Sequence, residues 1–555
     1  MTSETKVKFV VLAILDGWGI APESPGNAIA LAKTINMTKF WVSYPHAELE
    51  ASGESVGLPR GEDGNTETGH LNLGAGRIVY QDLERINMAI ADGTFFDNEV
   101  LKGAIIHAQK NKSNLHLIGL VGAGGVHSNL EHLIALIQLA AKNNFTRVFI
   151  HVFTDGRDSP PTSAKTYISR LNDVTKKENV GKVASIIGRY WAMDRDCRWD
   201  RTKKCYDALT LGEGRLVTTP EEAIEKSYSE GKTDEFIEPS IIKDDKNRPI
   251  TTIKDDDAVI FFNFRIDRPR QLTKAFVMTD FRYADTYLDY NPYSLGAELG
   301  TGEIPSKSAK EPFQRRKVLK NLFFVTMTDY GKPIADAGAK CAFPPEMIPS
   351  PLSGVISESG LKQLKITESE KEHFVTFYFN GLREKPYPLE DRIIIPSPHV
   401  PTYDQTPEMS AQRITETLIS RLSSGDYSFA LVNYPNPDMV GHTGNIGAAV
   451  KAIEVVDECI GKLANFVLAY EGVLIITSDH GNAEELINQV SGEIDTEHST
   501  SRVPFIVVGH PFLSKSQKLG TGILADVAPT IISLLKITVP SNMTGSNLLA
   551  DLREF

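Results

Sequence analysis

A series of apolar runs of strand length, each followed directly by polar side chains, constrains the fold more than any other feature of this sequence. The runs near the two ends of the chain are followed by carboxylates and imidazoles: Phe9–Leu15, Phe429–Tyr434 and Val473–Thr477. The central runs are followed mainly by arginines: Leu115–Val121, Arg147–Phe153, Val183–Ile187 and Ala258–Phe264. Helical patterns such as Leu130–Ala141 separate them. This alternation predicts an α/β fold with mainly parallel sheets, and ligands beyond the carboxyl ends of the strands.

The two groups of runs predict two domains. A chain of 555 residues exceeds the size at which one hydrophobic core keeps growing. Because the carboxylate and imidazole group comes from both ends of the chain, we expect a discontinuous domain that holds metal. The arginine group predicts a second domain, inserted into the first, that holds an anion.

Composition excludes several classes of protein. The net charge of −12 argues against a general nucleic-acid binder, because such domains usually carry a basic surface. The run Phe9–Leu15 is too short to span a bilayer and has no signal-peptide cleavage site, so no membrane association is expected. The four cysteines are scattered and predict neither a disulfide framework nor a thiolate zinc site. A reducing, cytoplasmic location fits best.

Carboxylates and imidazoles in the C-terminal part have the character of metal ligands. Asp438 and His442 are four residues apart, which places them on one face if the segment is helical. Asp479 and His480 are adjacent after a strand, and His498 precedes another apolar run. Taken singly, each motif is typical of a surface ion pair or a hydrogen-bonded core histidine. Together, oxygen and nitrogen ligands without thiolate favour Mn²⁺, Mg²⁺ or Zn²⁺.

The glycine-rich stretch Gly61–Gly76 allows two interpretations. Its Gly and Asn residues are typical of turns, which alone predicts a surface loop. The alternative is that Thr66 lies at a loop–helix junction as a nucleophile. A two-metal site would lower the pKa of the Thr66 hydroxyl and stabilise the oxygens of a phosphoryl group in transfer.

Several motifs resemble those of cofactor-independent phosphoglycerate mutase, a family of the alkaline phosphatase superfamily. They occur in order from about Val11 to about Pro540: Leu15–Gly19, Gly64–Arg77, Asp155–Asp158, Gly188–Tyr190, Met193–Asp196, Phe262–Arg268, Asn436–Gly444 and Ser478–Asn482. The resemblance implies an alkaline-phosphatase-like outer domain made of residues 1–80 and 344–555. It also implies an inserted α/β transferase domain, residues 81–343, that binds the substrate.

The resemblance also implies cofactors and site residues. It implies two Mn²⁺ ions, with Mg²⁺, Co²⁺ or Zn²⁺ as alternatives, and no requirement for 2,3-bisphosphoglycerate. One ion is expected on Asp438, His442 and His498, and the other on Asp16, Thr66, Asp479 and His480. Substrate contacts are expected from His127, Arg157, Asp158, Arg189, Arg195, Arg265, Arg268 and Lys371. The guanidinium group of arginine forms bidentate hydrogen bonds with carboxylate and phosphate, which suits an anion site in an acidic protein.

The implied reaction is the interconversion of 3-phosphoglycerate and 2-phosphoglycerate in glycolysis and gluconeogenesis. Thr66 attacks the phosphoryl group, glycerate reorients, and its 2-hydroxyl takes the phosphoryl group back. Lys371 is expected to reach the phosphoryl group, and Asp158 to act as acid–base residue toward the glycerate hydroxyls. We expect the two domains to close over the substrate, since water attack would make the enzyme a phosphatase. A monomer is expected.

The sequence departs from the family pattern at four places. Thr66 stands where the family usually has Ser, Gly122–Gly124 replaces Ser-Asp-Gly, and Glu372–Phe374 differs after Lys371. A polar stretch from about 283 to 316 is longer than the family's connection, and we expect it to be a surface insertion. The competing functions are a phosphopentomutase-like phosphoryl transferase, a metal-dependent phosphatase, and a non-catalytic descendant that binds phosphoglycerate or a protein.

Overall fold

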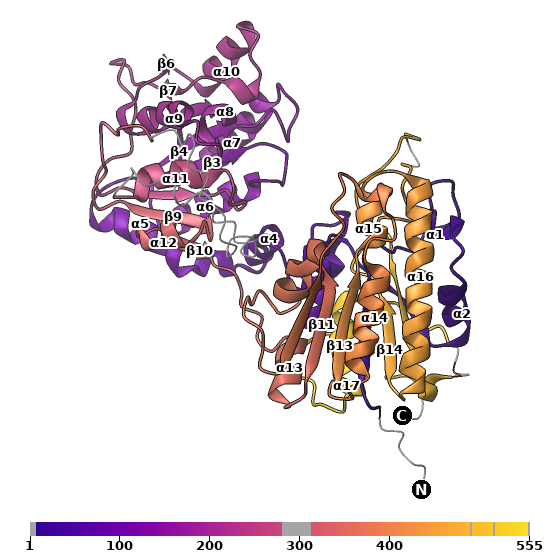
Figure 1. Ribbon diagram of the computed structural model, residues 1–555. Helices are drawn as coiled ribbons and strands as arrows, with labels where there is room; N and C mark the ends of the chain where they lie inside the picture. Colours follow the sequence, from indigo (N-terminus) through magenta and orange to yellow (C-terminus); the bar gives the residue numbers. More distant parts are fainter. Residues whose placement is uncertain (1–6, 280–311, 489–490, 514, 516, 553–555) are drawn as a thin grey trace. The chain divides into compact units, whose positions relative to one another are not determined.

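The computed structural model describes residues 7–279, 312–488, 491–513, 515 and 517–552, and it divides into two compact units (Figure 1). Unit 1 comprises Met1–Gln81 and Met347–Phe555, and unit 2 comprises Asp82–Glu346. Each unit contains one eight-stranded sheet. The predicted α/β class with mainly parallel sheets is confirmed. The polar stretch from about 283 to 316 lies mostly outside the described residues.

The sheet of unit 1 has β1 (Val10–Leu15) near its centre, between β13 (Phe429–Tyr434) and β14 (Val473–Thr477). The full order is β12 (Glu390–Ile395), β11 (Gln363–Glu368), β13, β1, β14, β15 (Val503–Val508), β2 (His46–Glu50) and β16 (Gly522–Ile523). The first five are mutually parallel, and β15 is antiparallel to both of its neighbours. All side chains of β1, β13 and β14 are buried, as expected for parallel strands covered on both faces.

The helices of unit 1 pack in two groups. The first group contains α1 (Ala28–Leu31), α2 (Ile35–Ser43), α14 (Ala411–Leu422), α15 (Asn436–Gly441) and α16 (Ile446–Ala469). In Figure 1 the long helix α16 runs alongside α14. The second group contains α3 (Thr66–Ala75), α13 (Leu352–Glu358) and α17 (Val527–Leu534). A large hydrophobic core extends through this unit, and a smaller cluster that includes Leu71, Ile348 and Phe377 lies at α3.

Unit 2 places β3 (Leu115–Val121) and β4 (Val148–Thr154) in the middle of its sheet. The full order is β10 (Lys340–Phe343), β9 (Phe323–Thr328), β8 (Ala258–Phe261), β3, β4, β5 (Lys182–Gly188), β7 (Ser240–Ile242) and β6 (Arg215–Val217). Neighbouring strands are parallel except β5 and β7. The strands predicted from the central apolar runs therefore lie side by side.

The helices of unit 2 separate its strands along the chain. They are α4 (Asp82–Asp92), α5 (Glu99–Lys110), α6 (Leu130–Lys142), α7 (Ala164–Glu178), α8 (Arg189–Ala192), α9 (Trp199–Leu211), α10 (Pro220–Ser229), α11 (Pro269–Val277) and α12 (Lys332–Asp336). The helix predicted over Leu130–Ala141 corresponds to α6. Among the described residues of both units, no helix has the length and apolar composition needed to cross a membrane.

Candidate active site

Three neighbouring parallel strands of unit 1 bring the predicted metal ligands to one edge of the sheet. Register pairs Leu15 of β1 with Tyr434 of β13, so both strands end at the same level. Asp16 follows β1 directly, and β14 runs into Asp479. Gly17 adopts a φ of +76°, and a Cβ there would lie 2.8 Å from the Cα of Asp438. Glycine therefore allows the chain to turn sharply after Asp16 against the segment that carries Asp438.

Thr66 is the first residue of α3, and its side chain is buried rather than part of a surface loop. Asn65 caps this helix, with its side-chain oxygen accepting from the Thr68 N–H at 2.9 Å. Thr66 is 5% exposed. The interpretation of Gly61–Gly76 as a surface loop is wrong for its second half, because Thr66–Ala75 is a largely buried helix. The exposed N–H groups of a helix start favour an anion at this position.

Lys371 and His480 flank the Thr66 hydroxyl. Thr66 Oγ1 lies 2.8 Å from His480 Nε2 and 3.0 Å from Lys371 Nζ. The same ammonium lies 2.8 Å from Asp16 Oδ1 and 2.7 Å from Asp438 Oδ2. Burial alone lowers the pKa of Lys371, but the carboxylates of Asp16 and Asp438 raise it well above its ordinary value. A permanently charged ammonium therefore lies beside the candidate nucleophile.

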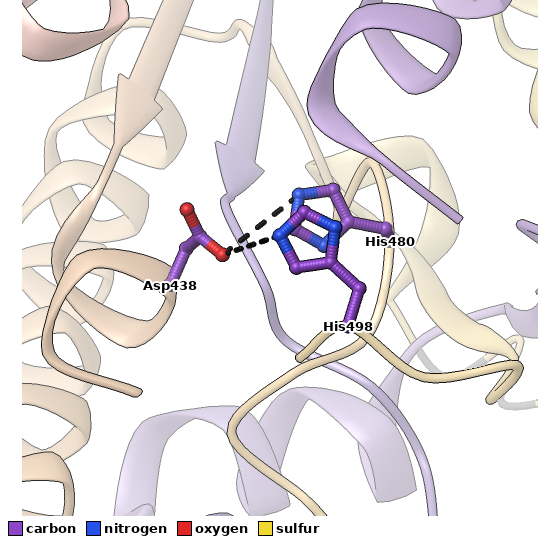
Figure 2. A group of neighbouring side chains, drawn as sticks. All are labelled: Asp438, His480 and His498. Carbon is purple, nitrogen blue, oxygen red and sulfur yellow. Dashed lines mark ion pairs between the residues drawn. The ribbon is translucent and has the colours of Figure 1, made fainter. Parts of the chain in front are cut away.

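The imidazoles of His442, His480 and His498 lie around Asp438, and Figure 2 shows Asp438 with His480 and His498. Asp438 Oδ1 lies 3.2 Å from Nε2 of both His442 and His498, and these two nitrogens are 3.2 Å apart. His480 Nε2 also lies 3.5 Å from Asp479 Oδ2. Every residue predicted to bind metal is thus brought into one constellation within unit 1.

Hydrogen bonding shows that these side chains fit a divalent cation. Nδ1 of His442 lies 2.7 Å from the Thr496 carbonyl, and Nδ1 of His498 lies 2.9 Å from the Gly64 carbonyl. Since a carbonyl only accepts, each Nδ1 carries the proton and each Nε2 is left with a lone pair, as in metal-binding histidines. Asp438 Oδ1 is buried and accepts no well-aligned hydrogen bond from the described residues. The nitrogen and oxygen donors suit a hard or borderline ion.

A proton competes with a cation for His480. Burial lowers the pKa of His480, but the carboxylates of Asp479, Asp438 and Asp16 outweigh burial and raise it to about 9. The carboxylates that attract a metal ion therefore also attract a proton to His480, and the affinity of His480 for a metal ion rises with pH.

Four of the predicted substrate residues of unit 2, Arg157, Arg189, Arg195 and Arg268, line a cavity of about 350 Å³. The arginines that line this cavity are Arg157, Arg189, Arg195, Arg198, Arg201 and Arg268. Arg189 Nη1 lies 2.6 Å from Asp158 Oδ2 and 2.5 Å from Asp155 Oδ1. Burial raises the pKa of Asp158, but Arg189 outweighs burial and holds it below its usual range, so Asp158 is a carboxylate. Arginines outnumber the lining carboxylates of Asp194, Asp196 and Glu235, so the cavity carries an excess of positive charge despite the acidic chain.

His127 and Arg265 join the same network through Asp267. Asp267 lies 2.7 Å from Arg195 Nη1, 3.4 Å from Arg265 Nε and 3.7 Å from His127 Nδ1. Burial, followed by the charge of Arg189, lowers the pKa of His127 to about 4. His127 is therefore neutral near pH 7 and can accept or donate one hydrogen bond without adding charge.

Comparison with known proteins identifies the family of this chain. The family model described as the BPG-independent PGAM N-terminus (iPGM_N) matches residues 86–332. The 2,3-bisphosphoglycerate-independent phosphoglycerate mutase of Moorella thermoacetica is 47% identical over 540 residues, covering 97% of this chain and 98% of the relative. That of Clostridium beijerinckii is 47% identical over 544 residues, covering 98% and 99%. The chain belongs to the BPG-independent phosphoglycerate mutase family.

A solved structure supports the same relationship, and the resemblance predicted from the motifs is confirmed. A structure of Leishmania mexicana phosphoglycerate mutase at low cobalt concentration has a TM-score of 0.57 and 30% sequence identity, and the match covers 98% of both chains. Family membership thus extends over nearly the whole chain, including both units.

The departures from the phosphoglycerate mutase pattern have local structural accounts. At Gly122–Gly124, the Ala123 N–H donates to Ser159 Oγ at 2.8 Å, so Ser159 supports the loop. His373 lies two residues after Lys371, and its ring stacks on the ring of Phe377 with 4.5 Å between the ring centroids. Thr66 keeps the hydroxyl of the usual serine in contact with two site residues.

Sequence reasoning missed several residues that touch the site. In unit 2 they are Asp155, Arg198, Arg201, Glu235 and Asp267, which hold or extend the arginine cluster. In unit 1 they are His70 and Asn433, which contact Asp479 and Asp16. His70, Asp155 and Asp267 lie inside motifs quoted for the family, so motif membership was a signal for them. Glu235 follows no such pattern.

Proposed function

We propose that this phosphoglycerate mutase family member interconverts 3-phosphoglycerate and 2-phosphoglycerate through a phosphothreonine at Thr66, without 2,3-bisphosphoglycerate and as a monomer. The observation that carries the proposal is the position of Thr66 Oγ1. It lies at a helix start, 3.0 Å from the Lys371 ammonium and 2.8 Å from His480 Nε2, next to carboxylates that fit a cation.

The proposal assigns two divalent ions to unit 1. Asp438, His442 and His498 would hold one ion, and Asp16, Thr66, Asp479 and His480 the other. We assign Mn²⁺, with Mg²⁺, Co²⁺ or Zn²⁺ as alternatives for the same ligands. When bound, such ions lower the pKa of a coordinated hydroxyl and neutralise charge on phosphoryl oxygens.

The chain's own groups in unit 1 carry out the transfer. The Thr66 oxygen gives up its proton and forms a bond to phosphorus while the bond from phosphorus to the glycerate 3-oxygen breaks, and that oxygen takes up a proton to become the 3-hydroxyl of bound glycerate. The Lys371 ammonium donates hydrogen bonds to the phosphoryl oxygens and offsets their negative charge. The N–H groups at the start of α3 face the same anion. In the second half-reaction the 2-hydroxyl oxygen of glycerate takes the phosphoryl group from Thr66.

Unit 2 supplies the groups assigned to glycerate. The arginine cluster around Arg189 and Arg195 binds its carboxylate, because guanidinium forks pair with carboxylates at two points. Arg157, Arg265 and Arg268 extend that positive surface. Asp158, an ionised carboxylate beside Arg189, is assigned to accept the proton of the glycerate 2-hydroxyl when that oxygen attacks. The neutral His127 is assigned to hydrogen-bond the substrate.

The test is conversion of 3-phosphoglycerate to 2-phosphoglycerate by EDTA-treated protein with and without Mn²⁺, in the absence of 2,3-bisphosphoglycerate. Thr66→Ala should lower turnover by at least about 10⁴-fold, whereas Thr66→Ser should retain Mn²⁺-dependent turnover. A folded, Mn²⁺-loaded wild type without turnover would refute the proposal, and the same samples then go to sugar phosphates. Phosphate release faster than isomerisation would identify a phosphatase instead.

A further inference from the structure

Two buried polar residues with no role in the proposed reaction connect the carboxylates of Asp16 and Asp479. His70 lies on α3, Asn433 lies on β13, and both side chains are 0% exposed. Asn433 contacts Asp16 and His70, and His70 contacts Asp479. The two residues therefore bridge two of the groups assigned to one metal ion.

The orientation of the Asn433 amide follows from its partners. Its Nδ2 lies 2.8 Å from Asp16 Oδ2 and 3.1 Å from His70 Nε2, and its Oδ1 accepts from the Thr367 hydroxyl at 3.3 Å. A carboxylate oxygen only accepts, so the atom facing Asp16 is the NH₂ group. The second N–H of that group points at His70 Nε2. Nε2 must then accept and carries no proton.

The other ring nitrogen of His70 is therefore the protonated one. Nδ1 lies 3.0 Å from the Thr66 carbonyl oxygen, which can only accept, and 3.1 Å from Asp479 Oδ2. The N–H is aligned with the Thr66 carbonyl, and Asp479 Oδ2 is a second, less aligned neighbour. Ligand atoms of His70, Asp16 and Asp479 lie close enough together to suggest a three-residue metal site. Because Nδ1 donates its proton and the single nitrogen lone pair, on Nε2, accepts from Asn433, His70 has no nitrogen free to bind an ion.

The two carboxylate oxygens of Asp16 have different partners. Oδ2 is held by Asn433, while Oδ1 faces Lys371 Nζ at 2.8 Å and His480 Nε2 at 3.4 Å. A buried carboxylate with one oxygen anchored keeps the other in a fixed direction, as outer hydrogen bonds do for metal ligands. His70 in turn ties the carbonyl of Thr66 to the end of β14.

We infer that His70 and Asn433 are positioning residues that orient Asp16, Asp479 and the first turn of α3 for the metal ion assigned to Asp16 and Asp479. This inference rests on the proposed function, because it requires that ion to bind. His70 acts as a neutral, Nδ1-protonated group, and it contacts neither substrate nor metal.

Calorimetric titration of EDTA-treated protein with Mn²⁺ tests the inference through binding rather than activity. His70→Leu should weaken Mn²⁺ binding at the site of Asp16 and Asp479 by about 10–100-fold. The ion assigned to Asp438, His442 and His498 should bind with unchanged affinity. A general loss of structure would weaken both sites, so the selective loss distinguishes positioning from packing.

Conservative variants separate the two sides of the ring. His70→Asn keeps a donor near the position of Nδ1, whereas His70→Gln places its amide near the position of Nε2 and leaves the position of Nδ1 without a donor. We expect His70→Asn to recover more Mn²⁺ affinity than His70→Gln. His70→Asn also keeps the test usable if His70→Leu does not fold.

Asn72→Leu is the matched control. Asn72 is on the same helix and 0% exposed, and its amide bonds Val56, Thr68 and Val79, none of which is assigned to the site. It should lower stability while leaving both Mn²⁺ affinities unchanged. Equal Mn²⁺ binding by wild type and His70→Leu, or a loss shared by both sites, would overturn the inference. A wild type that binds no Mn²⁺ would instead overturn the proposed metal site, and the inference with it.

Discussion

Replacing Lys371 by Met should strongly destabilise the metal-free protein, and Mn²⁺ should restore most of the loss. Lys371 Nζ lies 2.8 Å from Asp16 Oδ1 and 2.7 Å from Asp438 Oδ2, and all three side chains are at most 4% exposed. Removing one partner of a buried ion pair costs about 3–5 kcal/mol, because the remaining charge stays buried without its counter-charge. Here two carboxylates lose the same cation, so we expect about 4–5 kcal/mol.

Titration of Lys371 itself should add no pH dependence to this loss between about 6 and 9. The pKa of Lys371 is lowered by burial but raised more by Asp16 and Asp438, so it lies above the ordinary value of 10.5. A group with a raised pKa contributes fully below its unfolded-state pKa, and loses that contribution only as pH rises through the folded-state value. Lys371 is therefore charged in both the folded and the unfolded protein throughout this range.

Lys365 on β11 offers a matched control, because it is also a fully buried lysine of unit 1. Its ion pair with Glu390 spans 3.7 Å, and burial outweighs this contact and lowers the pKa of Lys365 to about 7. Lys365→Met removes a buried amine without changing the carboxylates of the site. Its effect on stability should therefore be the same with and without Mn²⁺.

Differential scanning calorimetry of EDTA-treated protein, with and without saturating Mn²⁺, measures both variants. The expected result is a large loss for Lys371→Met that shrinks when Mn²⁺ supplies positive charge to the same carboxylates. Wild-type stability of metal-free Lys371→Met would refute the electrostatic reasoning. So would Mn²⁺ stabilising Lys365→Met and Lys371→Met by equal amounts relative to wild type.

Three further predictions follow from other parts of the structure. Burial lowers the pKa of His132 to about 3, so the unfolded chain takes up this proton first as pH falls. In urea titrations, wild type should therefore lose about 2–3 kcal/mol more than His132→Gln between pH 7 and 4.5. A Cβ at Gly69 would lie 2.4 Å from the Asp479 carbonyl oxygen, so Gly69→Ala should cost at least about 2–3 kcal/mol in the same assay. Gly447→Ala, where the nearest atom is 3.6 Å away, should change stability by less than about 1 kcal/mol. Arg195→Lys should raise KM for 3-phosphoglycerate about tenfold in steady-state assays, because Lys lacks the planar fork; an unchanged KM would remove Arg195 from the substrate contacts.

The sequence predicted the strands and the polar residues that follow them because both leave a direct trace. A strand covered on both faces reads as an unbroken apolar run, and residues that follow such runs lie at the carboxyl edge of a parallel sheet. This rule predicted that Asp16 and Asp479 follow strands, and the structure shows that these strands, β1 and β14, are parallel neighbours. The arginines of unit 2 were found in the same way, since Arg189 directly follows β5 and Arg157 lies three residues after β4.

Residues that act through another side chain left a weaker trace. Asn433 lies inside an apolar strand. A single polar residue there indicates a buried hydrogen bond but does not indicate its partner. Its partners, Asp16 and His70, are more than 360 positions away along the chain, so only the folded structure shows that it orients them. Glu235 pairs with Arg157 from a connection after α10, a segment with no strand or helix periodicity that could have marked it.

The stretch around Thr66 shows why composition can predict the opposite of what the fold requires. Its glycines are typical of exposed turns, and a helix buried on all sides has no amphipathic stripe that periodicity could detect. In α3 the glycines serve close packing instead: a Cβ at Gly69 would meet the Asp479 carbonyl at 2.4 Å, and one at Gly74 would meet the Phe379 carbonyl at 2.0 Å. The first of these contacts brings the start of the helix against the end of β14. Glycine, which in the sequence suggests a flexible loop, therefore allows the helix that carries Thr66 to pack closely against Asp479.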